Sequence, residues 1–421
     1  MKYIVIGGSA AGLACAEQIR REDKTGEITV FTKESIMPYS RPSISYYLKG
    51  TVKESDMLLR RNSYYGAEDI KIITAAQVKA IDRKNKCVKA GRKSYPYDKL
   101  CICTGSKPFV PPVKNAAGKV NAFTFLDIEN AKQIKAKAGK NTRAVVIGAG
   151  LIGMKAAEGL SKICKSVDVV ELAPRVLPSI LDEKSAKSVK KFLETEGHIS
   201  FHLEQTVAEA KSKGDVITSV VLSSGKELPC DLLILAVGVR PESGLAEKAG
   251  LEVNRGIIID PATMRTSDEN IYAAGDCTVS VDMLDGSRKV IALWPNAVNQ
   301  GIAAGSQMAG GGKTVAGSYS VNAIDFYGLR ICTCGLINAK GSRYTDKILN
   351  SGGSCKRLIF EGNKLVGYVL INSSENAGIY TSLIETGADI SALPGDIYGT
   401  PGPFVFAKAE RDIRMKGALA L

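Results

Sequence analysis

The sequence lacks the cysteine spacings that are usual in metal-binding or dithiol redox sites. None of its ten cysteines forms a C-x-x-C or C-x-x-x-x-C pair. Two C-x-C pairs, Cys101/Cys103 and Cys332/Cys334, lie in strand-like segments, where residues i and i+2 share one face. We interpret them as small apolar side chains rather than metal ligands or disulfides, and we predict no metal site. Abundant unpaired cysteine is typical of a reducing cytosol, so we expect a cytoplasmic protein.

Long hydrophobic segments and nucleic-acid-binding motifs are also missing. No apolar run approaches the length of a membrane span, and the apolar start MKYIVIGG is too short for a signal peptide. The formal net charge is +13, but Lys and Arg are dispersed, without a helix-turn-helix, finger or aromatic–basic pattern. We therefore expect no membrane and no nucleic-acid partner. The positive charge indicates either a solvated surface or attraction of an acidic protein.

The sequence does contain two glycine motifs, each between a short apolar strand and an alanine-rich helix. VIGGSAAG covers residues 5–12, and VVIGAGLIG covers residues 145–153. This context is typical of the turn that holds a dinucleotide pyrophosphate at a helix N-terminus. Two such motifs, a domain length apart, predict two bound dinucleotides, FAD at the first and a nicotinamide nucleotide at the second.

The first motif departs from the usual pattern at two places. Gly7 permits the tight turn and Gly12 allows close packing of helix and strand, but Ser9 replaces the middle glycine. An acidic residue is expected at the end of the second strand, where it would bind a ribose hydroxyl, and Thr32 stands there instead. Glu34, two residues later, is either its substitute or a surface glutamate.

The second motif is complete, with Gly148, Gly150 and Gly153. Glu171 ends its second strand, where a carboxylate accepts hydrogen bonds from ribose hydroxyls and repels a 2′-phosphate. We therefore predict NADH as the nucleotide. Arg175 lies nearby and is suited to a phosphate, so NADPH stays open as the less favoured alternative.

A chain of 421 residues is too long for one core, and two or three domains are expected. We predict an α/β fold with two Rossmann-like, three-layer dinucleotide-binding domains, the NAD domain inserted in the FAD domain, plus a C-terminal α+β domain. The predicted domains are residues 1–112 (FAD-binding, first part), 113–242 (NAD(P)H-binding), 243–317 (FAD-binding, second part) and 318–421 (cap or interface).

Further motifs support a family resemblance: TGS at 104–106, AVGVRP at 236–241 and YAAGDC at 272–277. Together with the glycine motifs they resemble the pyridine nucleotide–disulfide oxidoreductase superfamily over nearly the whole chain. The branch with NADH oxidases and peroxidases, rubredoxin reductases and nitrite-reductase-type flavodomains is the most similar. The resemblance implies that Asp276 binds the FAD ribityl chain and that Gly275 lets the backbone approach.

The segment WPNAVNQG at 294–301 resembles the family's helix at the flavin pyrimidine end, which makes Asn299 and Gln300 candidate contacts. Trp294 belongs either there or to the core. The motifs and the resemblance together give these cofactor-binding candidates: Gly7, Ser9, Ala11, Gly12, Glu34, Arg41, Pro42, Thr104, Gly105, Gly148, Gly150, Ile152, Gly153, Glu171, Gly238, Gly275, Asp276 and Asn299.

The departures from the family pattern bear on the chemistry. Pro42 stands where the oxidase and peroxidase relatives carry a redox cysteine. Ala10 and Ala11 occupy the stretch of the peroxidase histidine, and the chain's two histidines, His198 and His202, fall in the predicted NAD domain. The C-terminal part also lacks the disulfide-reductase histidine–glutamate pair. Chemistry on disulfides or peroxides therefore loses its main groups.

Two lysines are candidate catalytic residues. In PYSRP, which resembles the rubredoxin-reductase and nitrite-reductase types, Arg41 is expected near the FAD phosphates or the flavin edge. Lys49 is either a neighbour of the isoalloxazine, where a cation stabilises the anionic reduced flavin, or a solvated helix end. Lys155 replaces the family's usual glutamate, and it either pairs with Glu158 one turn on or lies over the flavin.

The resemblance implies an FAD-dependent NAD(P)H oxidoreductase that passes electrons between NADH and a protein carrier of ferredoxin or rubredoxin type, without a redox-active cysteine. Such carriers are small and acidic, and a basic flavoprotein would attract them. One alternative is an NADH oxidase that forms hydrogen peroxide. Another is a flavoprotein subunit of a larger metalloenzyme, such as a nitrite reductase or carbon monoxide dehydrogenase. A homodimer or a complex with such a metalloenzyme is compatible with the sequence.

Overall fold

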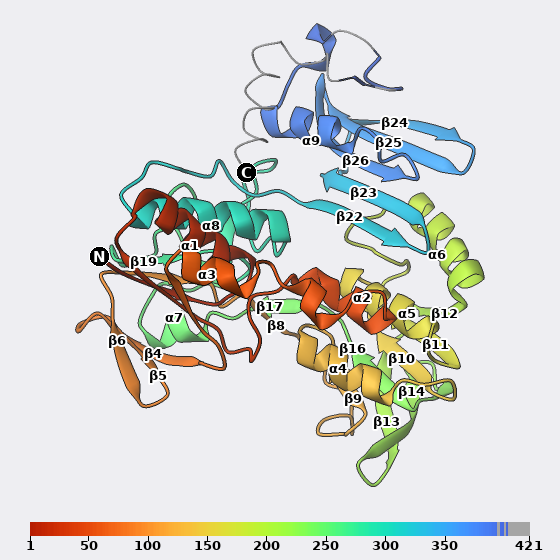
Figure 1. Ribbon diagram of the computed structural model, residues 1–421. Coiled ribbons are helices and arrows are strands. Elements are labelled where there is room, and N and C mark those ends of the chain that lie inside the picture. Colours follow the sequence, from red (N-terminus) through yellow and green to blue (C-terminus); the bar gives the residue numbers. More distant parts are fainter. Residues whose placement is uncertain (394–395, 400, 403–421) are drawn as a thin grey trace. The chain divides into compact units, whose positions relative to one another are not determined.

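The computed structural model describes residues 1–393, 396–399 and 401–402. Its contacts divide the chain into two compact units (Figure 1). The first consists of Met1–Pro174 and Gly197–Ser318, and the second of Arg175–Glu196 and the chain from Tyr319. The sequence did not predict that Arg175–Glu196, which separates the two parts of the first unit in the chain, belongs to the same unit as the C-terminal part. The three-domain boundaries given above stay predictions.

The first unit contains two parallel five-stranded sheets, and together they confirm the α/β fold. One has the order β19-β7-β1-β2-β3 and the other β12-β11-β10-β16-β9. The strands of the first are β1 (Lys2–Ile6), β2 (Glu27–Phe31), β3 (Ile70–Ile73), β7 (Lys99–Ile102) and β19 (Ile271–Ala273). Those of the second are β9 (Ala122–Thr124), β10 (Arg143–Ile147), β11 (Ser166–Glu171), β12 (Ile199–Leu203) and β16 (Leu232–Leu235). Valine- and isoleucine-rich strands of this kind are buried on both faces, as parallel sheets require.

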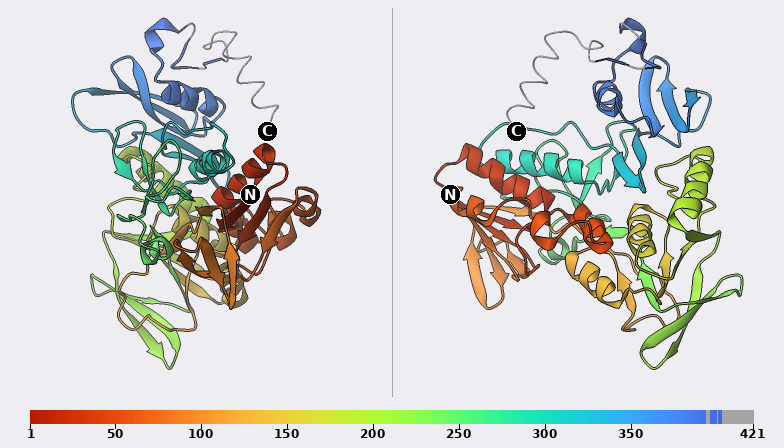
Figure 2. Two further views of the ribbon diagram at one scale, coloured as in Figure 1. Left: turned by 90° about the vertical axis from the view of Figure 1, so that its left-hand side faces the viewer. Right: turned by 45° about the vertical axis from the view of Figure 1, so that its right-hand side comes forward.

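Glycines allow two helices that pack against the first sheet to lie in close contact with each other. Helix α1 (Ala10–Glu22) and helix α8 (Trp294–Met308) run side by side in Figures 1 and 2. A Cβ atom at Gly301 would lie 2.2 Å from the Ala11 carbonyl oxygen, and one at Gly305 would lie 2.4 Å from that of Cys15. No larger side chain fits at these two positions. Helix α8, which contains both glycines, therefore holds α1 and the first glycine motif in place.

Shorter elements complete the first unit. Its antiparallel strands are β4 (Val78–Asp82), β5 (Cys87–Ala90), β6 (Lys93–Pro96), β8 (Ser106–Pro108), β13 (Val207–Lys213), β14 (Val216–Leu222), β15 (Glu227–Pro229), β17 (Val239–Pro241), β20 (Thr278–Val281) and β21 (Arg288–Lys289), and β18 (Ile257–Ile258) pairs parallel with β20. Its other helices are α2 (Ile44–Lys49), α3 (Asn62–Ala67), α4 (Ile128–Lys137), α5 (Leu151–Ser161) and α7 (Gly244–Lys248), with 3-10 turns η1 (Arg41–Ser43) and η2 (Glu54–Met57). No described helix has both the length and the apolar composition of a membrane span.

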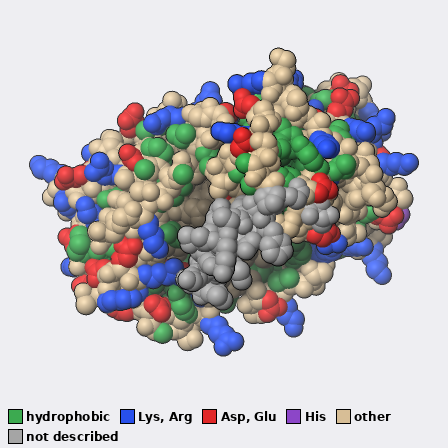
Figure 3. Space-filling view, turned by 90° about the horizontal axis from the view of Figure 1, so that it is seen from above, with side chains coloured by type: hydrophobic (Ala, Val, Ile, Leu, Met, Phe, Trp, Pro, Cys, Tyr) green, Lys and Arg blue, Asp and Glu red, His purple; other side chains and the backbone are tan. Residues whose placement is uncertain are grey.

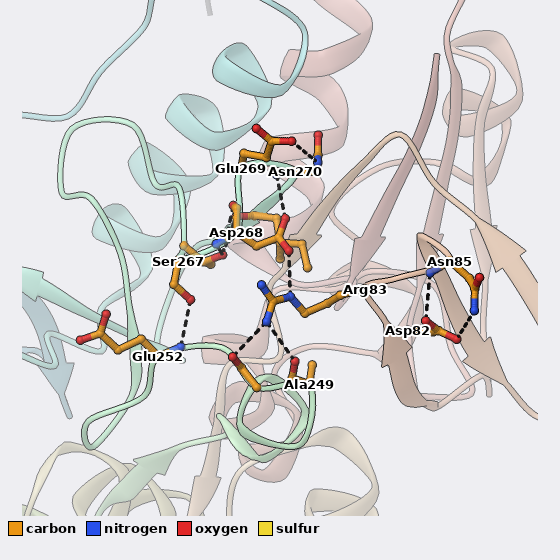
Figure 4. A network of polar contacts seen from close by, with 12 residues as sticks. Asp82, Arg83, Asn85, Ala249, Glu252, Ser267, Asp268, Glu269 and Asn270 are labelled. Carbon is orange, nitrogen blue, oxygen red and sulfur yellow. Dashed lines mark hydrogen bonds and ion pairs between the residues drawn. The ribbon is translucent and has the colours of Figure 1, made fainter.

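Arg83 connects segments that are far apart in the sequence (Figure 4). Its Nε donates to Asp268 Oδ2 at 2.8 Å, and its Nη1 donates to the Gly250 carbonyl at 3.0 Å. Asp268 also accepts from the Asn270 N–H at 2.9 Å. This network joins the loop between β4 and β5 to the chain that returns after the second parallel sheet.

The second unit is built on an antiparallel sheet of order β22-β23-β26-β25-β24. The strands are β22 (Val321–Phe326), β23 (Leu329–Gly335), β24 (Tyr344–Ser351), β25 (Ser354–Glu361) and β26 (Lys364–Ile371). Helix α9 (Ala377–Thr386) lies against this sheet (Figure 2), a 3-10 turn η3 (Ile390–Ala392) follows, and α6 (Glu183–Gly197) belongs here up to Glu196. Its core includes the fully buried side chains of Phe326, Tyr368 and Tyr380.

Candidate dinucleotide-binding site

A cavity of about 560 Å³ lies in the first unit, beyond the carboxyl ends of the strands of the first parallel sheet. Its walls include the residues that directly follow β1, β2, β7 and β19. In open α/β sheets, ligands bind at this edge. The cavity therefore stands where the first glycine motif predicts a dinucleotide.

The first glycine loop has the geometry that its spacing predicts. Gly7 has φ +116°, and a Cβ there would lie 2.0 Å from the Cys103 carbonyl oxygen. A Cβ at Gly12 would lie 1.8 Å from the Gly7 carbonyl oxygen. Ser9 precedes α1 without a side-chain capping bond, and both it and Ala11 line the cavity. The first N–H groups of α1 are thus available for a pyrophosphate.

Glu34 and Arg41 line the cavity and form an ion pair. Arg41 also donates from Nη1 to the Leu126 carbonyl at 3.1 Å. The Glu34 Oε2 atom is buried and accepts no hydrogen bond from the described residues. A buried carboxylate oxygen of this kind needs a donor, and the ribose hydroxyl of an FAD adenosine would supply one. This orphaned acceptor shows that the cavity fits the cofactor.

Asp276 is a second acceptor in the same cavity. The Ser106 hydroxyl donates to Asp276 Oδ2 at 3.1 Å, and burial raises the pKa of this aspartate. Gly275, at φ +85°, donates its N–H to Gln300 Oε1 at 2.7 Å. Gln300 is 3% exposed, so the sequence candidate acts on the loop from behind rather than facing the cavity. The arrangement would hold FAD hydroxyls at Asp276.

The structure brings some sequence candidates to the cavity and not others. Thr104 and Gly105 line it, and so does Trp294. Asn299 does not: it is exposed, on a different side of α8 from Trp294 and Ala297, which face the cavity. Pro42 is also exposed and outside the cavity lining, and so is Gly238, whose φ is +117°. Their roles in cofactor binding stay predictions.

The second glycine loop repeats the geometry of the first. A Cβ atom at Gly148 would lie 2.4 Å from the Ala236 carbonyl oxygen, and one at Gly153 would lie 2.0 Å from the Gly148 carbonyl oxygen. At Gly150, by contrast, no heavy atom lies within 4 Å of a Cβ position. The first and third glycines are therefore required by the fold, whereas the middle one leaves space for a ligand. Ile152 follows in the first turn of α5 and is half-buried.

Glu171 connects this glycine loop to the end of β11. Its carboxylate accepts from the Ala149 N–H at 2.6 Å and from the Ala173 N–H at 2.7 Å. Two backbone donors hold the carboxylate beside the loop. Arg175, the sequence candidate for a 2′-phosphate, donates instead to the carbonyls of Leu181 and Pro178.

Helix α2 packs against helix α5 through a buried charge cluster. Lys49 Nζ lies 3.0 Å from Glu158 Oε1, and Lys155 pairs with the other oxygen of the same carboxylate. Burial disfavours the charged carboxylate, but Lys155 and Lys49 outweigh it and hold the pKa of Glu158 below its ordinary value. Lys155 Nζ also lies 5.0 Å from the ring centroid of Tyr46. Of the two alternatives for Lys155, the ion pair with Glu158 is present, and Lys49 is not a solvated helix end.

The thiols beside the cavity are poor nucleophiles. All ten cysteines lie in the described part of the chain, and each is a free thiol. The hydrogen bond with Cys101 and burial raise the pKa of Cys103, which lines the cavity, well above its ordinary value. Burial raises the pKa of Cys277 to about 12. Thiolates are therefore disfavoured here, and the described residues contain no cluster suited to a metal ion.

Sequence reasoning missed the residues that support the site from a distance. Tyr46 belongs to no motif identified in the sequence, and Ser106 appears only within TGS. Both act through contacts with residues more than a hundred positions away in the chain.

The comparisons with known proteins agree with this geometry. Residues 1–301 match the family model described as pyridine nucleotide-disulphide oxidoreductase. An NADH oxidase of Methanocaldococcus jannaschii is 37% identical over 326 residues, covering 74% of this chain and 70% of that protein. A rubredoxin-NAD(+) reductase of Pseudomonas putida is 32% identical over 313 residues, covering 74% of this chain and 80% of that protein.

A similar solved structure, an NAD-dependent persulfide reductase from A. fulgidus, has a TM-score of 0.86 and 28% identity, over 100% of this chain and 84% of that one. The predicted fold, the FAD and NADH cofactors and the enzyme class are confirmed. The chain belongs to the pyridine nucleotide-disulphide oxidoreductase family and is an FAD-dependent NAD(P)H oxidoreductase of that family.

Proposed function

We propose that this protein transfers electrons between NADH and a small acidic electron-carrier protein of ferredoxin or rubredoxin type, through FAD and without a redox-active cysteine. The observation that carries the proposal is Pro42, which stands where oxidase and peroxidase relatives have their thiol. The thiol nearest the cavity, Cys103, has a raised pKa. With no thiol relay, electrons leave the flavin directly.

Different residues of the first unit would bind different parts of the two cofactors. The Gly7–Gly12 loop would bind the FAD pyrophosphate, Glu34 the ribose of its adenosine, and Asp276 its ribityl chain. The loop from Gly148 would bind the NADH pyrophosphate. When bound, FAD supplies hydride acceptance from NADH and single-electron release to a carrier.

Glu171 would select NADH over NADPH. Its carboxylate is held by two backbone N–H groups, so it cannot turn away from a nucleotide ribose without losing both bonds. A 2′-phosphate would meet this fixed negative charge. Arg175, which would favour NADPH, donates to the backbone carbonyls of Leu181 and Pro178.

The charge of the chain supports an acidic partner. The net charge is +13, and Figure 3 shows Lys and Arg side chains spread over one face among fewer acidic ones. This distribution favours long-range attraction by the whole molecule over a single docking patch. A relative that is named rubredoxin-NAD(+) reductase gives independent support.

The experiment measures NADH-dependent reduction of rubredoxin, of ferredoxin and of a neutral quinone at about 0.05 M and about 0.5 M NaCl. We expect kcat/KM for one carrier to fall at least about tenfold at the higher salt concentration, whereas the quinone rate changes little. Equal salt effects on carrier and quinone would contradict an electrostatically guided protein partner.

An NADH oxidase that forms hydrogen peroxide is the second candidate, because a relative of 37% identity carries the name NADH oxidase. Oxygen would then react with a flavin that no thiol protects. Rapid NADH consumption in air with a matching yield of peroxide, and no carrier reduction, would favour this function. Slow turnover with oxygen and with both carriers would favour a subunit of a larger metalloenzyme.

A further inference from the structure

Two thiols touch each other in the core of the first unit, at the end of β7. The Sγ atoms of Cys101 and Cys103 lie 3.4 Å apart, which is longer than the about 2.05 Å of a disulfide bond. Cys15 on α1 and Cys277 after β19 belong to the same hydrophobic core. The burial agrees with the interpretation of Cys101 and Cys103 as small apolar side chains. The direct contact between their sulfur atoms is an additional property, and it makes them a reduced thiol pair.

The pair adjoins the cavity in which the first glycine loop would hold FAD. Cys103 lines this cavity and is 7% exposed, whereas Cys101 is fully buried. A Cβ atom at Gly7 would lie 3.4 Å from the Cβ atom of Cys103, so Cys103 lies directly against that loop. A small molecule therefore reaches the pair from the cavity, and a group bonded to both sulfur atoms would change the wall on which the dinucleotide lies.

The protonation of the two thiols selects the kind of ligand. The hydrogen bond with Cys103 lowers the pKa of Cys101, but the hydrogen bond with Cys15 and burial outweigh it and hold that pKa well above its ordinary value. The hydrogen bond with Cys101 and burial raise the pKa of Cys103 as well. A divalent metal ion binds thiolates and has to displace these protons, and the described residues contain no cluster suited to such an ion. The pair therefore favours a soft ligand that accepts protonated thiols and leaves no charge in the core.

Trivalent arsenic hydroxides meet both conditions. They are neutral, and each hydroxyl group leaves as water when it takes the proton of a thiol. Arsenic is a soft and pyramidal centre, so its two sulfur ligands lie in van der Waals contact with each other, as the sulfur atoms of Cys101 and Cys103 already do.

We infer that Cys101 and Cys103 form a binding site for trivalent arsenic hydroxides, which is reached from the cavity and closed by bound FAD. With phenylarsonous acid, the hydrate of phenylarsine oxide, two As–O bonds and two S–H bonds break. Two As–S bonds and two water molecules form, arsenic stays trivalent, and no electrons are transferred. The inference goes beyond the proposed function, because neither NADH nor a carrier protein takes part.

The test exposes the reduced apoprotein to phenylarsine oxide without oxygen, removes unbound reagent on a desalting column, and measures the arsenic per chain and the intact mass. We expect one phenylarsenic group per chain, with the loss of two hydrogens. Cys101→Ala and Cys103→Ala each leave one thiol, so the second bond no longer forms within the molecule, and the apparent Kd should rise at least about tenfold. No bound arsenic in the parent would overturn the inference. If Cys101→Ala does not fold, as judged by thermal melting, Cys103→Ala decides.

Cys332→Ala is the matched control, because it removes one thiol of the other C-x-C pair, on β23 of the second unit. It should bind arsenic as the parent does. Loss of binding in Cys332→Ala, with normal binding in Cys103→Ala, would assign the arsenic to the other pair and overturn the inference.

Bound FAD tests the position of the site. The holoenzyme should take up phenylarsine oxide at least about tenfold more slowly than the apoprotein, and equal rates would contradict a site that FAD closes. Cadmium ions, which bind thiolates, should not bind to the pair. Cadmium that is bound by the parent and lost in Cys103→Ala would identify a metal site and overturn the inference. Failure to reduce ferredoxin or rubredoxin would reject the proposed function and leave these results unchanged.

Discussion

Lys49 Nζ lies 3.0 Å from Glu158 Oε1, and this ion pair joins the helix after the FAD cavity to the helix after the second glycine loop. Beside it, a Cβ atom at Gly159 would lie 3.0 Å from Leu48 Cγ, so the two helices are as close as their side chains permit. Breaking a buried pair of this kind leaves an uncompensated charge, which is costly. An ion pair within the tightly packed contact between α2 and α5 thus connects the two cofactor sites.

Gly12→Ala should abolish FAD binding. The new Cβ would lie 1.8 Å from the Gly7 carbonyl oxygen, which forces the pyrophosphate loop away from α1. We expect the purified variant to contain less than about a tenth of the FAD of the parent, measured from flavin absorbance. Gly66→Ala is the matched control, because no heavy atom lies within 4 Å of its Cβ position, and it should keep full FAD content. Normal FAD content in Gly12→Ala would contradict the geometry of the loop.

Glu171→Ala should weaken NADH binding and reduce the preference for NADH. It removes the acceptor of two backbone hydrogen bonds and the charge that opposes a 2′-phosphate. A loss of about 1–3 kcal/mol corresponds to a rise of about 5- to 150-fold in the KM for NADH. Steady-state kcat/KM values for NADH and NADPH measure the ratio. An unchanged ratio would show that another residue selects the nucleotide.

Arg83→Met should destabilise the protein in a pH-dependent way. Burial raises the pKa of Asp268, but the Asn270 N–H and Arg83 outweigh it and lower the pKa below its ordinary value. The carboxylate therefore contributes stability above its unfolded pKa of about 3.9, and this contribution is lost as the pH falls through the lower folded value.

We expect the loss in Arg83→Met to be about 1 kcal/mol at pH 7 and to shrink below about pH 4. The melting temperatures of parent and variant, compared across this range, measure it. Arg92→Met, at an exposed position, is the control and should melt like the parent throughout. A gap that persists unchanged at low pH would assign the effect to the carbonyl contacts of Arg83 alone.

Cys103→Ala should retain NADH oxidation and electron transfer. The thiol lines the FAD cavity, but its raised pKa keeps it protonated, and the account gives it no redox role. We expect kcat within about twofold of the parent at equal FAD content, since the substitution removes one small buried group. Loss of turnover with FAD still bound would show a thiol relay and reject direct electron transfer from the flavin.

The glycine positions were predictable because their requirements are local. Gly7 and Gly148 need positive φ, and Gly12 and Gly153 need close approach to the backbone five residues before them, so a short motif carries the information. The parallel pairing of β1 with β2 and of β10 with β11 belongs to the same strand–helix–strand units.

Contacts across long sequence separations were not predictable from spacing. Lys49 and Glu158 are 109 residues apart, and nothing in the sequence around either residue identifies the other as its partner. The i,i+3 pair of Lys155 and Glu158 was foreseen because helix geometry alone places it. Asn299 shows the opposite case: a family resemblance placed it at the site, but the helix turns it away from the face that Trp294 and Ala297 present to the cavity.

The central claim is that electrons pass from NADH through FAD to a protein carrier without a thiol. Anaerobic stopped flow tests it most directly: the enzyme is reduced with one equivalent of NADH and mixed with rubredoxin, with ferredoxin or with oxygenated buffer. The account predicts rapid reoxidation by one carrier, slowed by salt, and much slower reoxidation by oxygen. Rapid reoxidation by oxygen alone would contradict it and identify an oxidase.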